Sequence, residues 1–565
     1  MNKQSFLKGS AILLGMVLIT KALGLIYKIP LTNMLGGSGM AYYSGAFAVF
    51  APLLAASVSG ISASVARLTA ESCAFGRYAH MRKLRRCAML AYSAVGIFAC
   101  LLLIMLSFPL AKAFLPDTRA VWTLWALAPS LVFCAVLSVQ RGCCEGMGNM
   151  LPTAASEIAE TAAKALLGLI GAYAVFRYAD AEFAASHGCF GEFCRTKEAA
   201  RAAALPYAAA AAILGSSLST ALAAAVLAVH RKLRGDGITE EMLASDKVTD
   251  PPREIIKRLF AHSLPIAGAA VITTLSGAID LLTVPRGLMK AAEAGMKLPE
   301  GMPASGAADF IYGSYTGLAL MICGLVPTFT AMFGKSALPA LTESRSRGDG
   351  RGLRSGVNSL LAVSLLTALP GGAFISAVPE EILTFLFAGR TAEIACTAAP
   401  LRILGAGCIF MSVSLPVLSA LQTLRMRIAP MIIMAAGAVI KLAGNLLLIP
   451  MPGVGISGAA ISTAVSQGAI CIAALTLLLR RTGAVPSFRQ VLLKPAFAVL
   501  LGACTARLTA DVISRSGTGA ASSRAAALAA PAAGLGIYIL SLWLMNVLPR
   551  KHIKRYFSKK FRKTY

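Results

Sequence analysis

Two long apolar stretches of this chain each begin with a proline and each enclose a lysine. The first runs from Pro152 past Lys164, and the second runs from Pro430 past Lys441. An ionised side chain at bilayer depth is costly unless it faces an aqueous cavity or a partner, so such lysines are candidates for a functional site. Because the pattern occurs once in each half of the chain, it predicts a duplicated transporter with a cationic cavity.

The composition is typical of an integral membrane protein. Hydrophobic residues make up 57% of the 565 residues, charged residues make up 14%, and the mean hydropathy is +0.72. We expect an all-α membrane protein with about fourteen transmembrane helices, because apolar segments long enough to cross a hydrocarbon core of ~30 Å recur along the whole chain. These segments lie near residues 9–30, 41–66, 87–111, 120–140, 153–176, 204–229, 260–285, 310–334, 355–378, 397–421, 428–449, 456–479, 492–514 and 525–548.

The net charge of +28 follows a membrane topology and does not indicate a nucleic-acid partner. If the N-terminus is cytoplasmic, the inside loops around Arg82, Arg253 and Arg347 hold most of the basic residues together with the tail, as the positive-inside rule requires. We therefore expect a multi-pass protein of the cytoplasmic membrane with both termini in the cytoplasm. The basic tail is either a regulatory or partner-binding site or a topology anchor on anionic headgroups.

An internal repeat of six helices is visible in the sequence. The motif Gly215-Ser-Ser-Leu-Ser-Thr220, for example, is echoed by Gly458-Ala-Ala-Ile-Ser-Thr463. Six is an even number, so both copies should have the same orientation in the membrane. The predicted parts are an N-terminal six-helix lobe at 1–230, a cytoplasmic interlobe linker at 231–257, a C-terminal six-helix lobe at 258–481, two additional helices at 482–548 and a basic cytoplasmic tail at 549–565.

Four segments resemble the signatures of a known transporter family. They are Arg141-Gly-Cys-Cys-Glu-Gly-Met-Gly-Asn-Met-Leu-Pro152 through Lys164, Leu418-Ser-Ala-Leu-Gln422 with Lys441-Leu-Ala-Gly-Asn445, Ile279-Asp280-Leu-Leu-Thr-Val-Pro285-Arg286, and Lys21-Ala-Leu-Gly-Leu-Ile-Tyr27-Lys28-Ile-Pro30. In this order they resemble the stage V sporulation protein B group of polysaccharide transporters. That group lies in the multidrug/oligosaccharidyl-lipid/polysaccharide exporter superfamily, whose relatives include the lipid II flippase.

The resemblance implies a fold and a function. The expected fold is a V-shaped bundle of two six-helix lobes with two added helices. The expected activity is alternating-access movement of an undecaprenyl-pyrophosphate-linked oligosaccharide, or of a lipid II-like peptidoglycan precursor, across the cytoplasmic membrane. The expected partners are the lipid-linked sugar, membrane lipids and envelope-synthesis enzymes. The glycan, the oligomeric state and the choice between vegetative wall, sporulation and exopolysaccharide stay open.

Basic residues in the spans predict a route for an anionic cargo. A pyrophosphate that crosses a low-dielectric core needs cations along its path, because an unpaired charge is poorly solvated there. The substrate-binding residues expected from the two lobes are Lys21, Lys28, Lys164, Arg402, Lys441 and Asn445. Lys21 and Lys28 are seven residues apart and thus share a helix face. For Lys21 the alternative is a side chain that extends to the membrane interface.

Acidic residues accompany these lysines. Glu157, Glu160 and Lys164 have helical spacing on one face, so Glu160 can pair with Lys164 one turn later. This pair is either a gate or coupling pair that releases its lysine to phosphate, or a neutral pair that only helps helix packing. Asp280 and Arg286 are the other predicted gating or coupling residues. Asp280 either binds a coupling cation or pairs with a basic residue on another helix.

An enzyme is not expected from this sequence. It contains no recognisable metal cluster, nucleophile-base constellation or phosphate-cradling glycine loop, so we predict no cofactor and leave the coupling ion open between Na⁺ and H⁺. Two other functions stay as alternatives. The lysines argue against a cation-coupled multidrug exporter, and the intramembrane charges argue against a non-transporting membrane scaffold for envelope or spore-wall synthesis. Whether Cys189 and Cys194 form a disulfide in their predicted outer loop is also left open.

Overall fold

A computed structural model describes residues 6–235, 249–296, 299, 303–424, 426, 428–487, 489–516, 520–545 and 547. These residues are almost entirely helical, and their one β-structure is a hairpin of two short strands, β1 (Gly188–Cys189) and β2 (Glu192–Phe193). The predicted all-α class is therefore confirmed. Most of the predicted linker, at 236–248, and the whole of the predicted tail lie outside the described residues.

Within the described residues, twelve helical segments are long and apolar enough to cross a membrane, and a bent pair at 304–323 and 325–334 raises the number to thirteen. The prediction of about fourteen spans is not confirmed. The difference arises near the N-terminus, where the predicted spans 9–30 and 41–66 both overlap one segment, Gly15–Ala74. Its 60 residues would extend about 90 Å as one straight helix, three times the thickness of a hydrocarbon core.

Two glycines interrupt this long segment. Helix α1 (Phe6–Val58) is broken at Gly36, which has φ 63° and ψ −173°. Helix α2 (Ile61–Ala74) follows a second glycine, Gly60, with φ 88°. Glycine adopts positive φ without the steric penalty that a Cβ imposes. The break at Gly36 lies between the predicted spans 9–30 and 41–66, whereas the break at Gly60 lies inside the predicted span 41–66.

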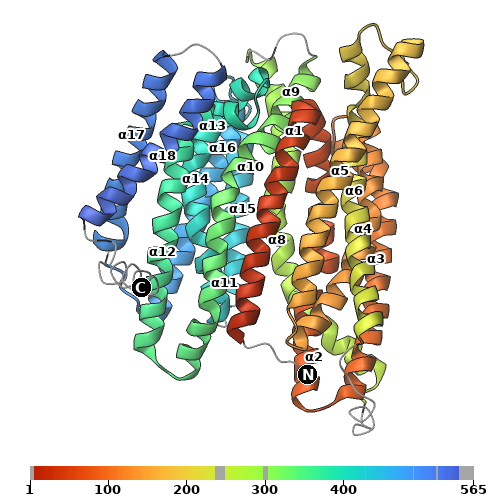
Figure 1. Ribbon diagram of the computed structural model, residues 1–565, viewed down its shortest axis with the longest axis vertical. Coiled ribbons are helices and arrows are strands. Elements are labelled where there is room, and N and C mark those ends of the chain that lie inside the picture. The colour runs from red at the N-terminus through yellow and green to blue at the C-terminus, as the bar shows by residue number, and fades with distance from the viewer. Residues whose placement is uncertain are drawn as a thin grey trace, which may run out of the picture. The chain divides into compact units, whose positions relative to one another are not determined.

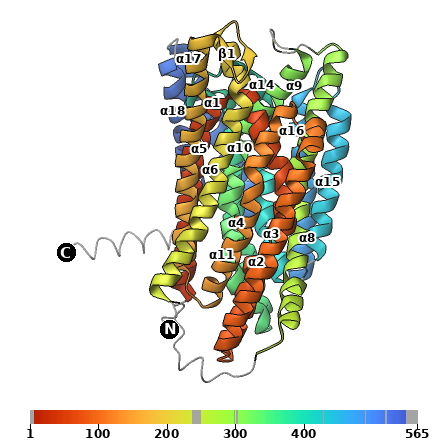
Figure 2. The ribbon, with the colours of Figure 1, turned by 90° about the vertical axis from the view of Figure 1, so that its right-hand side faces the viewer.

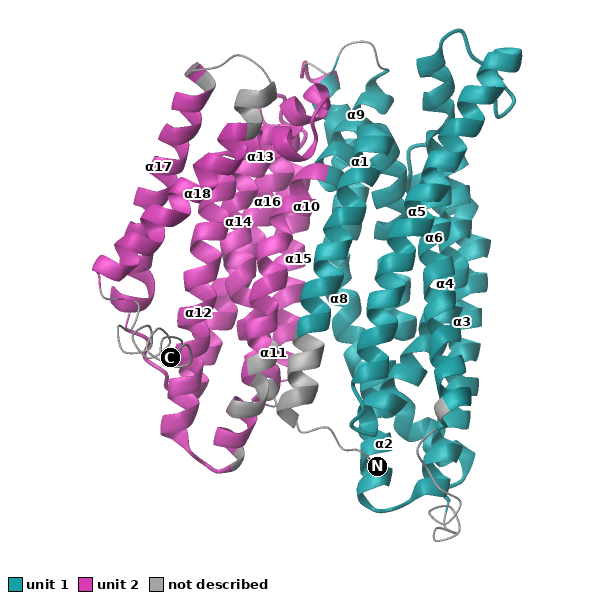
Figure 3. Cartoon of the chain, in the orientation of Figure 1, with its two compact units in different colours: residues 1–292, 297–317 teal, residues 293–296, 318–565 magenta. Residues whose placement is uncertain are grey.

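The chain forms two compact units, which Figure 3 colours separately. Unit 1 comprises Met1–Ala292 and Lys297–Gly317, and unit 2 comprises Glu293–Met296 and Leu318–Tyr565. The sequence repeat instead starts its second copy at residue 258. Packing units and sequence repeats need not end at the same residue, so the lobe boundaries stay a prediction.

Unit 1 is a helical bundle (Figures 1 and 2). After α1 and α2 it contains α3 (Tyr78–Phe114), η1 (Thr118–Ala120), α4 (Val121–Gly146), α5 (Leu151–Ser186), α6 (Lys197–Arg234), α8 (Pro252–Glu293), α9 (Ala304–Ser314) and part of the π-helical turn η2 (Tyr315–Ala319). Helices α5 and α6 lie side by side in both views. The hairpin β1–β2 joins them at one end.

Helix α8 is fixed to unit 1 along its length. Near its start, Ile255 and Leu259 are buried in an apolar cluster with side chains of α2, α3 and α4. Further along, Tyr92 of α3 donates a hydrogen bond of 3.0 Å to the hydroxyl of Ser263. Near the other end, Arg286 donates to the backbone oxygen of Ala113 at 2.9 Å. The first helix after the predicted linker therefore packs with the helices that precede the linker.

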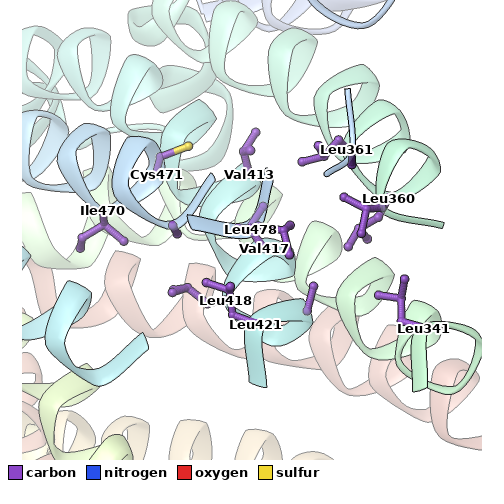
Figure 4. Packing of buried hydrophobic residues seen from close by; sticks show 14 of the residues in the cluster. Leu341, Leu360, Leu361, Val413, Val417, Leu418, Leu421, Ile470, Cys471 and Leu478 are labelled. Atoms are coloured by element: carbon purple, nitrogen blue, oxygen red, sulfur yellow. The ribbon is translucent and has the colours of Figure 1, made fainter. Parts of the chain in front are cut away.

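Unit 2 contains the remaining helices. They are α10 (Leu320–Cys323), α11 (Leu325–Ser346), α12 (Gly350–Ala377), α13 (Pro379–Leu386), α14 (Thr391–Thr423), α15 (Ile428–Leu448), α16 (Ile456–Thr482), η3 (Arg489–Leu493), α17 (Lys494–Ser516) and α18 (Ala520–Leu544). Figure 4 shows an apolar cluster in this unit, in which Val413, Val417 and Leu421 of α14 pack with Leu360 of α12 and Leu478 of α16. The three α14 residues are four apart and so form one helix face.

Small residues let helices approach closely in both units. Gly168 of α5 meets Gly215 of α6, and Gly502 of α17 meets Gly534 of α18. At Gly215, an added Cβ would collide with the backbone of Gly168. Close backbone contact of this kind stabilises membrane helix pairs, because lipid tails offer no hydrophobic drive for association.

The hairpin between α5 and α6 buries two thiols. Cys189 is 0% exposed and Cys194 is 4% exposed, and both are free thiols. The Cys189 Sγ–H donates to the backbone oxygen of Ala200 at 3.1 Å. Burial raises the pKa of the Cys189 thiol to about 11. This thiol is therefore protonated and poorly reactive at neutral pH.

We expect the close contact between α5 and α6 to be sensitive to one methyl group. Gly215→Ala should destabilise the protein by about 1–3 kcal/mol, because the added Cβ meets backbone rather than a movable side chain. In the matched control Gly277→Ala, on α8, a Cβ would meet nothing within 4 Å, so its stability should not fall. Thermal unfolding of the two variants in detergent measures the difference, and equal midpoints would contradict the predicted contact.

We also expect a distinctive pH profile for the labelling of Cys189. In the folded Cys194→Ser variant, its maleimide reaction should accelerate about tenfold per pH unit up to about pH 10, because only the scarce thiolate reacts. In the unfolded chain, with an ordinary thiol pKa of about 8.5, the rate should level off above about pH 9. Mass spectrometry of the labelled peptide, after reduction, gives both profiles. A plateau near pH 9 in the folded protein would show that the thiol is not buried.

Candidate functional site

Lys164 of α5 lies inside unit 1 against aromatic rings of α1. Its Nζ is 5.0 Å from the centroid of the Phe47 ring and 5.8 Å from the centroid of the Tyr27 ring. Cation–π contacts at such distances stabilise an ammonium group by about 0.5–2 kcal/mol. Tyr43 supports the wall, because its hydroxyl is 3.4 Å from that of Tyr27 and its ring centroid is 5.0 Å from that of Phe47. The wall attracts the charge of Lys164 without neutralising it.

Glu160, one turn before Lys164, has partners on two other helices. Arg141 of α4 donates to Glu160 Oε2 at 2.8 Å, and Thr220 of α6 donates to Glu160 Oε1 at 2.8 Å. Arg141 also donates from Nε to the hydroxyl of Ser156 at 3.0 Å. The ion pair is mostly shielded, with 17% of the Arg141 side chain and 22% of the Glu160 side chain exposed. This network joins α4, α5 and α6.

The ion partner of Glu160 differs from the predicted one. The spacing of Glu160 and Lys164 places them on one helix face, but the guanidinium of Arg141 on the neighbouring helix pairs with the carboxylate instead. A planar guanidinium matches the geometry of a carboxylate better than an ammonium group does. Lys164 turns to the aromatic wall. Glu157 is half-buried on the same helix, and its gating role, like that of Glu160, stays a prediction.

The two predicted lysines of α1 differ in their surroundings. Lys28 is half-buried and is near enough to Lys164 for their charges to repel each other. Lys21 is exposed, and the choice between the binding and interfacial roles stays a prediction. Unit 1 thus brings Lys28 and Lys164 together but does not bury Lys21 with them.

In unit 2, α15 buries its polar residues and exposes its apolar ones. Lys441 is 3% exposed and Asn445, one turn later, is 1% exposed. They continue an inward stripe that includes Gly437, whose backbone oxygen accepts a hydrogen bond of 2.7 Å from Ser466 of α16. By contrast, the helix exposes bulky apolar side chains, among them Ile432, Val439, Leu446 and Leu447. The charge of Lys441 lies within electrostatic reach of the buried Cys323.

The other predicted site residues are spread over both units. Arg402 is exposed on α14. Arg286 is exposed on α8, and its guanidinium lies 5.7 Å from the ring centroid of Phe114. Asp280 is 2% exposed and lies within electrostatic reach of Tyr312 of α9. Both predicted roles of Asp280, cation binding and pairing with a basic residue, stay predictions, as do the roles of the two arginines.

Sequence reasoning missed four residues of the unit 1 network as site residues. They are Tyr27, Phe47, Arg141 and Thr220. Arg141 could have been found, because a charged residue at the end of a predicted span falls under the rule that selected Lys164. Thr220 and Phe47 have no such signal, since uncharged side chains are frequent in apolar segments. Their importance depends on helix packing alone.

The geometry offers cationic and aromatic groups to a ligand. Among the described residues, no group of three or more His, Cys, Asp and Glu side chains could hold a metal ion. Each unit instead carries a shielded lysine, Lys164 in unit 1 and Lys441 in unit 2. A low-dielectric setting strengthens the attraction of such groups for anions and their repulsion of cations.

The sequence matches known membrane proteins. Residues 6–189 match the family described as polysaccharide biosynthesis protein. The chain is 23% identical over 466 residues to stage V sporulation protein B of Bacillus subtilis, covering 82% of this chain and 81% of that protein. It is 21% identical over 493 residues to the lipid II flippase MurJ of the same species, covering 84% and 83%. The resemblance predicted from the four motifs is therefore confirmed.

The fold matches a solved flippase structure. A lipid II flippase MurJ in an inward closed conformation superposes with a TM-score of 0.62 and 12% identity, and covers 94% of this chain and 97% of its own. At this level of identity the match shows the fold alone. Together with the apolar helices it shows a multi-pass membrane protein of the cell membrane.

We expect Arg141 and Glu160 to be energetically coupled. Removing one charge leaves the other shielded from water without its ion partner, whereas removing both leaves no unpaired charge. The coupling energy between the two residues should therefore be about 1–3 kcal/mol. A double-mutant cycle with Arg141→Gln and Glu160→Gln, followed by chemical or thermal unfolding in detergent, measures it.

The matched control is the exposed pair Arg347–Glu343, whose side chains are 75% and 60% exposed. Its coupling should be below about 1 kcal/mol, because solvent screens a surface pair. Equal coupling in the two cycles would mean that the Arg141–Glu160 pair is not shielded in the membrane-embedded protein.

Proposed function

We propose that this protein is a flippase that moves an undecaprenyl-pyrophosphate-linked oligosaccharide, or a lipid II-like precursor, across the cytoplasmic membrane by alternating access. The observation that carries the proposal is the burial of Lys441 on a helix that exposes its apolar residues. Ionisable residues at membrane depth mark substrate or ion pathways, because burying a charge in hydrocarbon is costly. Lys164 in the first unit supports the same conclusion.

The sign of the charge favours an anionic cargo. A pyrophosphate group can exchange its hydration for the lysines while the lipid chain stays in the hydrocarbon. The aromatic wall of Tyr27 and Phe47 adds faces on which sugar rings can pack. Similarity to stage V sporulation protein B and to a lipid II flippase supports this cargo class. We propose Lys28, Lys164, Lys441 and Asn445 as binding residues.

In this proposal the protein is a transporter and not an enzyme, and both termini face the cytoplasm. The basic loops and the tail fit that orientation under the positive-inside rule. Glu160 then acts as part of a gate with Arg141, because phosphate is a competing acceptor for the guanidinium. Asp280 is the proposed site of coupling to Na⁺ or H⁺. The flipping assay distinguishes this function from the two alternatives, a cation-coupled drug exporter and a non-transporting scaffold.

The test is a flipping assay in liposomes with fluorescent undecaprenyl-pyrophosphate sugars. Lys164→Glu and Lys441→Glu should each lower the flipping rate at least tenfold, or about 1.4 kcal/mol, because each change places repulsion beside the pyrophosphate. Binding should strengthen with phosphate charge and weaken with salt. The matched control Lys290→Glu, at an exposed position near the end of α8, should flip at the wild-type rate.

Three results would overturn the proposal. Wild-type rates in both lysine variants would remove the lysines from the path. Displacement of the lipid by cationic drugs, together with gradient-dependent drug export, would favour the exporter. Absence of any transport, with intact folding by size-exclusion chromatography, would favour the scaffold.

A further inference from the structure

A cavity of about 320 Å³ lies at the end of unit 1 where α2 ends and where α3 and α8 begin. One part of its wall is apolar, formed by Leu68, Phe75, Leu84 and Ile255. Phe75 is 73% exposed.

The other part of the wall holds basic groups that converge on one carboxylate. Arg77 donates from Nη2 to Asp250 Oδ1 at 2.9 Å. Arg258 Nη1 and His80 Nε2 lie 3.5 Å and 3.9 Å from Asp250 Oδ2. Both of these distances exceed the usual hydrogen-bond range. Of these three side chains, only Arg77 lies within hydrogen-bond distance of the Asp250 carboxylate.

Asp250 and its neighbour are held to α3 by further contacts. The backbone N–H of Asp250 donates to His80 Nδ1 at 3.3 Å, and the other ring nitrogen, Nε2, faces the Asp250 carboxylate. Lys83 donates to the hydroxyl of Thr249 at 3.2 Å. The hydrogen bond from Arg77 holds the pKa of Asp250 below its ordinary value, so the carboxylate is ionised at neutral pH.

We propose that this cavity is a binding site for a phosphate group, which competes with Asp250 for Arg77, His80 and Arg258. Phosphate has more acceptor oxygens and more charge than a carboxylate, and guanidinium groups bind it in a bidentate manner. Glu71, in the wall, and Glu254, 3.6 Å from Arg258 Nε, oppose a second anion. Phosphate therefore binds by replacing Asp250 rather than beside it.

Replacement of Asp250 has a structural consequence. Residues 249 and 250 lead directly into α8, so a phosphate in the cavity detaches the entry of α8 from α3. The apolar wall suits a phosphate carried on an apolar molecule, while the basic groups alone suit free phosphate. Both sources share the chemistry that the site recognises. This site is separate from the proposed transport residues, so it does not depend on the proposed function.

The experiment is isothermal titration calorimetry on the purified full chain in a neutral detergent. The probes are inorganic phosphate and dihexanoyl phosphatidylglycerol, with dihexanoyl phosphatidylcholine as the uncharged comparison. Asp250→Asn should bind at least one anionic probe about tenfold more tightly than the wild type, because the competing charge is gone. Adding Arg77→Gln or Arg258→Gln should abolish that gain. The matched control Arg201→Gln removes an arginine that pairs with Asp180 at 2.8 Å at the other end of unit 1, and it should leave binding unchanged.

The two probes distinguish the sources. Binding of both anions supports a site for free phosphate, and binding of phosphatidylglycerol alone supports a site for a lipid headgroup. No tightening by Asp250→Asn for either probe, or equal binding of phosphatidylcholine, would overturn the proposal. If Asp250→Asn does not fold, Arg258→Gln in the wild-type background gives the answer, since 49% of the Arg258 side chain is exposed. Unchanged phosphate binding in that variant would also overturn the proposal.

Discussion

The cost of a charged or hydrogen-bonding group in hydrocarbon organises both units. Because lipid tails are as apolar as leucine, hydrophobicity alone does not determine which face of a helix packs against its neighbours. Polar groups and glycines supply that information. In unit 1, Glu160 ties α5 to Arg141 of α4 and to Thr220 of α6. In unit 2, the inward stripe of α15 selects the face that meets α16.

The two units shield a lysine by different means. Lys164 is half-buried against Phe47 and Tyr27, so its charge is attracted by ring faces and is still available to an anion. Lys441 is almost fully buried and has Asn445 one turn later on the same stripe. The repeated pattern in the sequence therefore corresponds to similar positions in unlike surroundings. If both bind cargo, they hold it with unequal strength.

The features that could be predicted from the sequence are those that a single segment of the chain determines. Apolar length predicted the helices, and a lysine within such a segment predicted an inward side chain, as Lys441 shows. Features that depend on two segments were not predictable. The partner of Glu160 depends on how α4 meets α5, and the packing of α8 depends on contacts such as Tyr92 with Ser263. The break at Gly60, inside the predicted span 41–66, depends on a dihedral angle that glycine permits without requiring it.

Helix α15 buries polar residues and exposes bulky apolar ones, and this arrangement affects how unit 2 is assembled in the membrane. A lysine near the middle of a helix raises the apparent free energy of insertion by about 2.5–3.5 kcal/mol, and the leucines, isoleucines and valines of the segment must offset it. Until α16 arrives, Lys441 and Asn445 face lipid or the translocation channel. Helix α16 follows α15 after a short connection. The hydroxyl of Ser466 on α16 donates a hydrogen bond to the backbone oxygen of Gly437 on α15. Early pairing of the two helices would therefore lower the cost of inserting α15.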